Sequence, residues 1–346
     1  MSQFTAAQYV EHLAATVQAV TTGKPADNII SSHPTLDLLT SGIKSGSGLT
    51  NRFPVHLGLS NRTERTDRSA TTNTAPTPQG TANAIFDWSQ IVRTPARSRF
   101  LDLELNKGNE TQIYDAAQHD AAQAIEDHRN FLVQDIHALG ATYDPGTPGD
   151  QDAPIVPLDV LIGDATTDAL INGGAGWAVG GIRTFNDGTA APAQNAAWQS
   201  TVLTLDPDLY SHRAALRQLR RTIYNNSGSQ AHVTDYLAGF DFYAGLEDEL
   251  DNYVRISDNQ KVETVHSDIR VDGVRVRLDP DMTGNLTTRV YGIHKPSMVI
   301  KKLNDHFMKT SEPRNIQGTE DFITYLTSVL TMYTDVRRNH GRFDYV

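Results

Sequence analysis

VDGVRVRLDPDMTGNLTTRVYGIHKPSMVIKKL, Val271 to Leu303, is the stretch whose pattern says most about the fold of this chain. It begins with an Asp-Gly pair between two strand-like runs, and a two-residue Asp-Gly turn is the strongest short signal of a β-hairpin. Such a turn pairs Val271 with Val274 on one face and sets Arg270 beside Arg275 on the other. The sequence therefore predicts a hairpin with one apolar and one charged face.

Three carboxylates belong to this stretch, Asp272, Asp279 and Asp281. A calcium site needs six to eight oxygen ligands, and these three stand at opposite ends of one predicted strand. Pro280 cannot donate to a sheet ladder and aspartate favours turns, so Asp279-Pro280-Asp281 is expected to end the strand. We interpret the stretch as turn geometry. The sequence leaves open whether any of the three carboxylates binds a cation.

The bulk composition excludes several classes of protein. The chain has 346 residues, enough for one large domain or two to three smaller ones. A formal charge of -11 argues against a dedicated nucleic-acid-binding protein. The absence of cysteine excludes disulfides, thiolate catalysis and cysteine-ligated metals. We expect no membrane span and no signal peptide, because the chain has no window of about 18 apolar residues and its first residues lack a basic region.

The N-terminal third has the pattern of an arm. Residues 1–51 combine a short amphipathic helix with the Gly/Ser-rich segment TSGIKSGSGLTN, which is expected to be extended. Alternating apolar residues follow in FPVHLGLS and, after the polar run Asn61–Asn83, in IFDWSQIV and RFLDLEL. Alternation with period two is typical of half-buried strands. We therefore expect a long β-hairpin arm with a polar tip.

A helical period begins at Asn109 and is expected to stop at Gly140. About thirty residues at 1.5 Å each give a helix of roughly 45 Å, which has to lie along something comparably long. One face is marked by Ile113, Ala117, Ala121, Ala124, Ile125, His128, Leu132, Ile136 and Leu139.

The rest of the chain mixes short elements. DVLIG and STVLTL are expected to be strands, NGGAGWAVGG a surface loop, and SHRAALRQLRRTIYNN a helix. TRVYGIH, SMVIKKL and DFITYLTSVLTMYTDV read as later strands. The predicted helix carries a basic face, which we expect to be solvated or paired with acidic neighbours rather than to bind phosphate: Arg213, Arg217, Arg220 and Arg221.

Fragments of a serine-enzyme signature occur in the chain. Ser41 and Lys44 match S-x-x-K, and Ser257 begins an S-D-N match. The third motif of penicillin-binding proteins, K-T-G, is met only by Lys309-Thr310-Ser311, with serine replacing glycine. Ser41 also lies in the Gly/Ser-rich segment and not at the start of a buried helix. A serine acyl-transferase using Ser41, Lys44 and Ser257 is therefore kept as an alternative function.

The order of elements resembles the HK97-fold major capsid protein of tailed bacteriophages. Val271–Leu303 looks like that family's hairpin and returning strand, and DFITYLTSVLTMYTDVRRNHGRFDYV looks like its closing strand. The resemblance implies an α+β fold with an N-terminal arm, a long β-hairpin E-loop, a long spine helix, a P-domain sheet and an A-domain. The implied parts are the arm 1–51, the E-loop 52–106, a P-domain segment 107–154 with the spine helix 109–140, the A-domain 155–284, and returning P-domain strands and C-terminus 285–346.

The resemblance also implies a function. It implies a structural protein, not an enzyme, that self-assembles into an icosahedral shell around phage double-stranded DNA, in the virion, after assembly in the host cytoplasm. Implied partners are further copies in hexamers and pentamers, a separate scaffolding protein, a portal and decoration proteins, with no cofactor, metal or membrane. A β-rich surface-binding module is the other alternative. Triangulation number, host and maturation trigger cannot be read from the sequence.

The predicted E-loop is basic within an acidic chain. Residues 52–101 hold seven arginines against Glu64, Asp67 and Asp87, a net charge of +4, which suits docking on acidic neighbours. No lysine lies between Arg52 and Asn106, so a lysine cross-link in the loop is not expected, and arm and loop leave no room for a fused scaffolding segment. The candidate intersubunit contacts are Arg62, Arg65, Arg68, Phe86, Trp88, Arg93, Arg97 and Arg99.

Overall fold

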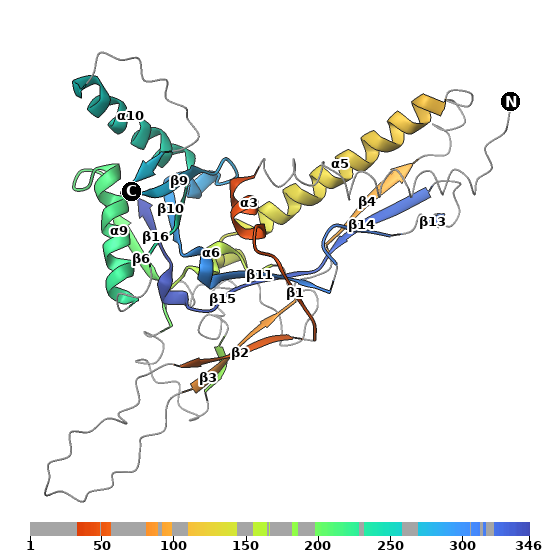
Figure 1. The fold of residues 1–346 in the computed structure, drawn as a ribbon, viewed down its shortest axis with the longest axis horizontal. Helices are drawn as coiled ribbons and strands as arrows, with labels where there is room; N and C mark the ends of the chain where they lie inside the picture. Colours follow the sequence, from red (N-terminus) through yellow and green to blue (C-terminus); the bar gives the residue numbers. More distant parts are fainter. Residues whose placement is uncertain are drawn as a thin grey trace, which may run out of the picture.

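The structure is a computed structural model that describes residues 33–48, 50–56, 81–88, 92–98, 110–143, 155–164, 166, 182–185, 198–227, 232–257, 269–304, 306–311, 314–315 and 322–346. These residues form an elongated lobe around one long helix and a compact lobe around a six-stranded sheet (Figure 1). The predicted N-terminal helix, the tip of the arm and the loop NGGAGWAVGG lie outside the described residues.

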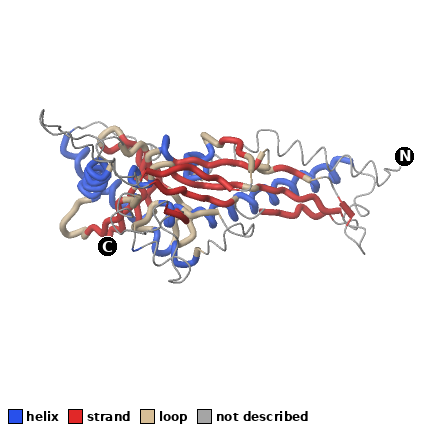
Figure 2. The backbone as a smooth tube through the Cα atoms, turned by 90° about the horizontal axis from the view of Figure 1, so that it is seen from below, coloured by secondary structure: helices blue, strands red, loops and turns tan. Residues whose placement is uncertain are grey.

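The elongated lobe is organised by helix α5, Glu110–Ile136. It packs along strands β4, Val92–Ser98, and β14, Phe322–Ser328, which pair antiparallel over their whole length (Figure 2). Short strands β12, Lys309–Thr310, and β13, Arg314–Asn315, complete this four-stranded sheet. At 1.5 Å per residue the helix is about 40 Å long. The helix thus lies along a long antiparallel strand pair as expected, but the two seven-residue strands, each about 23 Å long, cover only part of its length.

The buried face of α5 follows the predicted period. Ala124, Ile125, His128, Leu132 and Ile136 are all buried. The helix ends at Ile136, earlier than the predicted stop at Gly140, which instead begins the 3-10 helix η1, Gly140–Thr142. The turn is held because the backbone N–H of Gly140 donates to Asp159 Oδ2 at 2.7 Å.

A second sheet joins the elongated lobe to the rest of the chain. Strand β1, Lys44–Gly46, lies parallel to β11, Met298–Leu303, and β11 pairs antiparallel with β15, Leu330–Thr334. Helix α3, Pro34–Thr40, and the 3-10 helix η5, Lys295–Ser297, lie beside it.

The predicted strand at DVLIG is wrong, because residues Leu158–Leu161 form the single helical turn α6. All four of its residues are buried, and Pro157 stands at its N-cap. A short apolar run without alternation does not distinguish a buried strand from a buried helical turn.

The compact lobe is built on a six-stranded sheet in the order β6-β16-β10-β7-β9-β8. Strands β6, β16, β7 and β9 run in one direction, while β10 and β8 run in the other. The strand bounds are β6 Thr201–Leu205, β7 Asp235–Ala238, β8 Arg270–Val271, β9 Val274–Leu278, β10 Arg289–Ile293 and β16 Gly341–Tyr345. The 3-10 helices η4, Gly284–Leu286, and η6, Arg337–Asn339, precede β10 and β16.

The predicted hairpin is confirmed. Asp272 and Gly273 both have positive φ, 50° and 83°, as a two-residue turn of this type requires. Val271 pairs with Val274 and Arg270 with Arg275. The valines are buried, Arg270 is exposed, and β9 ends at Leu278, directly before Asp279-Pro280.

Two helices cover one face of this sheet, α9, His212–Asn226, and α10, Phe240–Ser257. The first was predicted and begins at the N-cap Ser211. The sheet separates two apolar cores, because side chains alternate across a strand. Val290 of β10 belongs to the core under α9 and α10, whereas Tyr291 and Ile293 belong to the core shared by α3, α5 and α6. Strands β10 and β16 follow residue 284 in the chain, and both belong to the sheet of the compact lobe.

The base of the predicted β-hairpin arm is a separate three-stranded sheet. Strand β2, Thr50–His56, pairs antiparallel with β3, Thr81–Asp87, and β3 pairs with β5, Ile182–Phe185. The inner ends of the predicted hairpin are thus present. Strand β4 departs from that hairpin and joins the sheet under α5, because its full length is paired to β14.

Candidate assembly surfaces and the joint between the lobes

Two aromatic side chains fasten the base of the arm to the chain's own sheet. Phe86 is buried and stacks on Tyr333 of β15 with ring centroids 5.6 Å apart. Trp88 is also buried, and its Nε1 donates to the carbonyl of Gly48 at 2.9 Å. The Trp88 ring lies so close to Gly46 that a Cβ there would be 2.9 Å from it. Both aromatic candidates therefore lie against the base of their own subunit.

The arginine candidates fall into two groups. Arg93 and Arg97 lie in β4, opposite Thr327 and Ile323 of β14, in the sheet along α5. They are thus separated from the anchor formed by Phe86 and Trp88. The remaining candidates lie outside the described residues: Arg62, Arg65, Arg68 and Arg99. An intersubunit role for these side chains stays a prediction.

Asp279 forms a buried joint that the sequence did not reveal. Its side chain has no exposed surface, accepts a hydrogen bond from Thr35 Oγ1 in the first turn of α3, and lies 3.0 Å from His137 Nε2 directly after α5. Burial alone would raise the pKa of Asp279, but His137, Thr35 and the backbone N–H of Asp281 together lower it below its ordinary value. The end of β9 is thereby tied to both helices.

The neighbouring carboxylate extends this joint, since Asp281 pairs with Nδ1 of His33. Within the part of the chain that the structure describes, no group of histidine and acidic side chains is arranged to hold a metal ion. In the structure Asp279 contacts His137 and Thr35, and Asp281 contacts His33. The sequence feature that could have predicted this role is a carboxylate directly after an apolar strand, because such a carboxylate needs polar partners when it is buried.

A second ionic cluster clamps α6 to the compact lobe. Arg289 Nη1 donates to Asp159 Oδ1 at 2.5 Å and its Nε to Asp344 Oδ1 at 2.5 Å. Arg342 also pairs with Asp159. The fully buried Arg337 donates to the carbonyls of Val160 and Leu161 at 2.8 and 3.0 Å. These contacts satisfy the buried charges of both arginines and of Asp159, so removing any one partner would leave a buried charge uncompensated.

The basic face of α9 is paired with an acidic neighbour, as the sequence predicted. Arg217 donates to both carboxylate oxygens of Asp272, from Nε at 2.8 Å and from Nη2 at 2.9 Å. Arg220 donates to the Asp272 carbonyl at 3.2 Å, and Arg213 lies 3.9 Å from the carboxylate. The hydrogen bond from Arg217 leads the effects that lower the pKa of Asp272.

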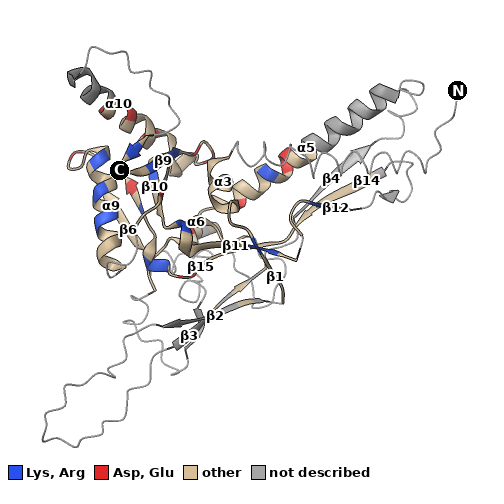
Figure 3. Ribbon diagram, in the orientation of Figure 1, with Lys and Arg blue, Asp and Glu red and all other residues tan. Residues whose placement is uncertain are grey.

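The serine-enzyme motifs are not brought together. Ser41 follows α3, is exposed, and donates to the carbonyl of Leu38 at 3.0 Å. Ser257 ends α10, and Lys309-Thr310-Ser311 lies at β12, at the opposite end of the molecule from α10 (Figure 3). The alternatives of a serine acyl-transferase and a surface-binding module receive no support.

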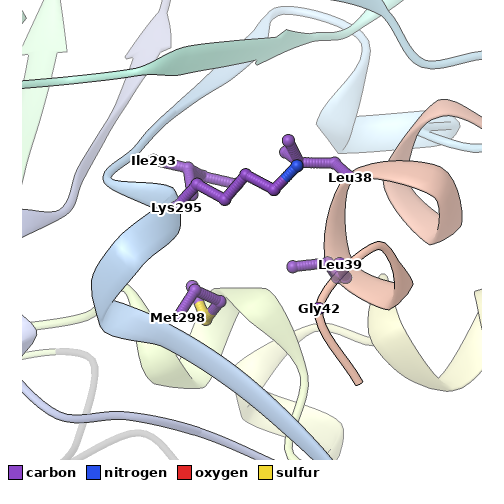
Figure 4. A pocket seen from close by; sticks show the side chains of 6 residues that line it. All are labelled: Leu38, Leu39, Gly42, Ile293, Lys295 and Met298. Atoms are coloured by element: carbon purple, nitrogen blue, oxygen red, sulfur yellow. The ribbon is translucent and has the colours of Figure 1, made fainter. Parts of the chain in front are cut away.

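A small pocket lies between α3 and the turn before β11. Figure 4 shows the Lys295 side chain crossing it toward Leu38. The pocket has a volume of about 50 Å³ and is lined by Leu38, Leu39, Gly42, Ile293, Lys295 and Met298. Ligand sites usually span some 300–1,000 Å³, so this pocket has room for little more than water.

Helices of the described residues give no membrane span, since none is both long and apolar enough to cross a bilayer. No protein-family model matches the chain, and no curated protein matches it in sequence. The family expectation is therefore tested by solved structures.

Several similar solved structures are phage capsids. The chain is 14% identical to the capsid asymmetric unit of cyanophage A-1(L), with a TM-score of 0.61 over 91% of this chain and 93% of that one. For the cyanophage Pam1 capsid asymmetric unit the identity is 11% and the TM-score 0.52, over 86% of both chains. For the satellite phage P4 procapsid including size determination (Sid) protein they are 10% and 0.51, over 99% and 92%. The resemblance seen in the sequence is confirmed at the level of fold, and this chain has the mixed α+β fold of phage capsid proteins.

Proposed function

We propose that this chain is a major capsid protein of a tailed bacteriophage, a structural and non-enzymatic protein that self-assembles into an icosahedral shell enclosing double-stranded DNA in the virion. The observation that carries the proposal is the likeness to the cyanophage A-1(L) capsid asymmetric unit, which spans 91% of this chain and 93% of that one. A likeness of nearly full length in both chains leaves little of either chain for another role.

The parts of an HK97-type subunit can be assigned to the described elements. Helix α5 is the proposed spine helix, and the sheet of β4, β12, β13 and β14 with the sheet of β1, β11 and β15 forms the proposed P-domain. The compact lobe with α9 and α10 is the proposed A-domain, to which we add β10 and β16. Strands β2 and β3 are the base of the proposed E-loop, and residues 1–51 the proposed N-terminal arm.

The anchor at Phe86 and Trp88 gives the E-loop base a fixed direction. A hairpin of two strands is marginal in water by itself, so its direction has to be set by packing at its base. Phe86 on Tyr333 and Trp88 on Gly46 and Gly48 supply that packing from the β1–β11–β15 sheet of the same subunit and the turn after β1. The loop would then present its arginines to a neighbouring subunit in one orientation.

Partners follow from the same proposal. The chain would bind further copies of itself in hexamers and pentamers, together with a portal, a separate scaffolding protein and decoration proteins. The P4 procapsid structure includes a size determination protein beside the capsid, which supports accessory partners of this kind. A net charge of -11 would keep the inner wall from binding the enclosed DNA tightly.

The proposal is tested by expressing the chain alone and with its phage's neighbouring genes, followed by sedimentation velocity and negative-stain imaging. We expect closed shells or capsomers of five and six copies. Particles should dissolve in hot detergent to a single band near 38.0 kDa, because the E-loop has no lysine and the chain no cysteine. A chain that stays monomeric under all of these conditions would refute the proposal.

A further inference from the structure

The compact lobe carries a dense basic patch. It consists of four arginines of α9: Arg213, Arg217, Arg220 and Arg221. Arg213, Arg217 and Arg220 all contact Asp272. Figure 3 shows the patch at the end of the lobe that points away from α5. A chain of charge -11 thus presents a strongly positive surface at one place.

The same lobe carries an acidic patch at the N-terminal end of α9. It consists of Asp206, Asp208, Asp248 and Glu249, of which the first three are exposed. They surround Tyr345 and His212, whose rings lie 4.8 Å apart. Glu249 lies 3.6 Å from His212 Nδ1, and the negative charges of Glu249, Asp206 and Asp208 add to the effect of burial in raising the pKa of Tyr345.

An apolar side chain stands in the middle of the acidic patch. Leu209 follows Asp208 in the turn held by the bond from the Leu209 N–H to the Asp206 carbonyl, and it is 76% exposed. A leucine left so exposed within a charged loop is suited to a contact with another surface. The aliphatic stems of arginine side chains are such a surface, because they cover apolar groups while their charged ends pair with carboxylates.

We propose that the acidic patch of one copy, with Leu209 at its centre, docks on the basic patch of the next copy, and that this contact joins compact lobes within a capsomer. The inference rests on the proposed function for the existence of capsomers and adds the surfaces that form them. Two different patches on one chain make a heterologous contact, which generates a ring of five or six copies when the rotation between neighbours closes at that number.

A second copy fits these patches better than DNA does. The complementary charges occur on the chain itself, within one lobe. DNA approaching the basic patch would also meet Asp206, Asp208 and Asp248 at the adjoining end of α9, and these repel phosphate. Complementary patches of this kind set the choice and register of partners.

The test is a charge reversal in each patch and in both. One variant carries Asp206→Lys and Asp208→Lys, a second carries Arg220→Glu and Arg221→Glu, and a third carries all four changes. A matched control carries Glu126→Lys and Asp127→Lys, which are exposed on α5 and change the charge by the same amount as the first variant. The fraction of chain in capsomers and shells is measured by sedimentation velocity at about 50 and 500 mM salt, where screening differs strongly.

We expect each single-patch reversal to lower the assembled fraction at least about tenfold at low salt, because juxtaposed like charges oppose docking. The variant with all four changes should recover an assembled fraction within about twofold of wild type, since its patches are again complementary. The control should assemble normally. Circular dichroism and the unfolding midpoint show whether each variant is folded.

Three results would overturn the inference while wild type still forms shells. Single reversals could assemble like wild type, or the four-fold variant could assemble no better than the single ones. The α9 reversal could also abolish retention of a short DNA duplex while leaving assembly unchanged, which would assign the basic patch to DNA. A wild-type chain that forms neither shells nor capsomers would refute the proposed function itself and the inference with it.

Discussion

Asp272 lies in the turn of the β8–β9 hairpin and Asp279 directly follows β9, and the two carboxylates differ in burial and in the partners that they contact. Asp272 occupies the turn at the outer edge of the compact lobe, is 32% exposed, and is surrounded by arginines of α9. Asp279 follows the other end of β9, is fully buried, and holds Thr35 and His137 from two helices. The outer carboxylate faces solvent and, by our inference, another subunit. The inner carboxylate belongs to the joint that fixes the two lobes.

The two carboxylates differ in how much of their hydration they lose when the chain folds. An exposed carboxylate keeps much of its hydration, so its ion pairs contribute little to stability. A buried carboxylate loses its hydration and depends on its partners, so removing either side leaves a buried polar group uncompensated. Substitutions at the two ends of β9 should therefore differ severalfold in their effect on the free energy of unfolding.

Asp279→Ala should have the largest effect. Removing the carboxylate leaves Thr35 and His137 without their partner in the core, and such losses cost about 3–5 kcal/mol of unfolding free energy. Urea unfolding of the assembly-competent subunit measures this value. Asp279→Asn is the matched control, because an amide oxygen can still accept from Thr35, and it should lose less. An Asp279→Ala subunit as stable as wild type would show that the joint contributes nothing.

Trp88→Ala comes next and tests whether the arm is fixed by its anchor. Truncating a buried tryptophan costs roughly 3 kcal/mol, and here the cost should fall on the contact between the arm and the β1–β11–β15 sheet. We expect a folded subunit whose β2 and β3 amides exchange faster, and which fails to close shells. Ser41→Ala, an exposed change beside the same sheet, should assemble normally. Loss of function on Ser41→Ala with no effect of Trp88→Ala would favour the serine-enzyme alternative.

The same hairpin shows which features of the fold can be predicted from the sequence and which cannot. The Asp272-Gly273 turn and the buried face of α5 were predictable because both are set by residues close together in the chain. The role of Asp279 was not, because Thr35 lies 244 residues away in sequence. Helix α10 was not predicted, although Phe242, Leu246 and Leu250 recur at helical spacing. By sequence alone, the apolar run of α6 is compatible with a strand or a helical turn. In the structure it is a helical turn, with Pro157 at its N-cap and the Val160 carbonyl bonded to Arg337 of the compact lobe.

As the pH falls, protonation of buried histidines in the interior should lower the unfolding free energy before the exposed carboxylate at the outer edge has an effect. Burial lowers the pKa of His128 to about 4 and that of His340 to about 3, so each of these two rings binds fewer protons in the folded than in the unfolded chain below pH 6.5. Asp135 offsets part of this effect, because burial raises its pKa to about 6. Stability is therefore lost as the pH falls through 6.5 toward these values, by up to about 1.4 kcal/mol per pH unit for each histidine. Urea titrations at pH 7, 6 and 5 measure the slope. A midpoint that does not change over this range would contradict the buried, neutral state of both rings.

Asp272→Ala should have the smallest effect on the subunit. Its partners Arg213, Arg217 and Arg220 remain hydrated when the carboxylate is removed, so we expect a loss of at most about 1 kcal/mol. The turn survives because Gly273 still supplies its positive φ, although alanine at position 272 has to adopt φ near 50°. Asp272→Asn separates the two causes, since asparagine tolerates that backbone conformation but carries no charge. Removing the carboxylate also makes the basic patch more positive, so assembly at low salt should be unchanged or strengthened while unfolding free energy falls slightly. A large loss of stability from Asp272→Asn would place this carboxylate in the same class as Asp279 and remove the distinction between the two ends of β9.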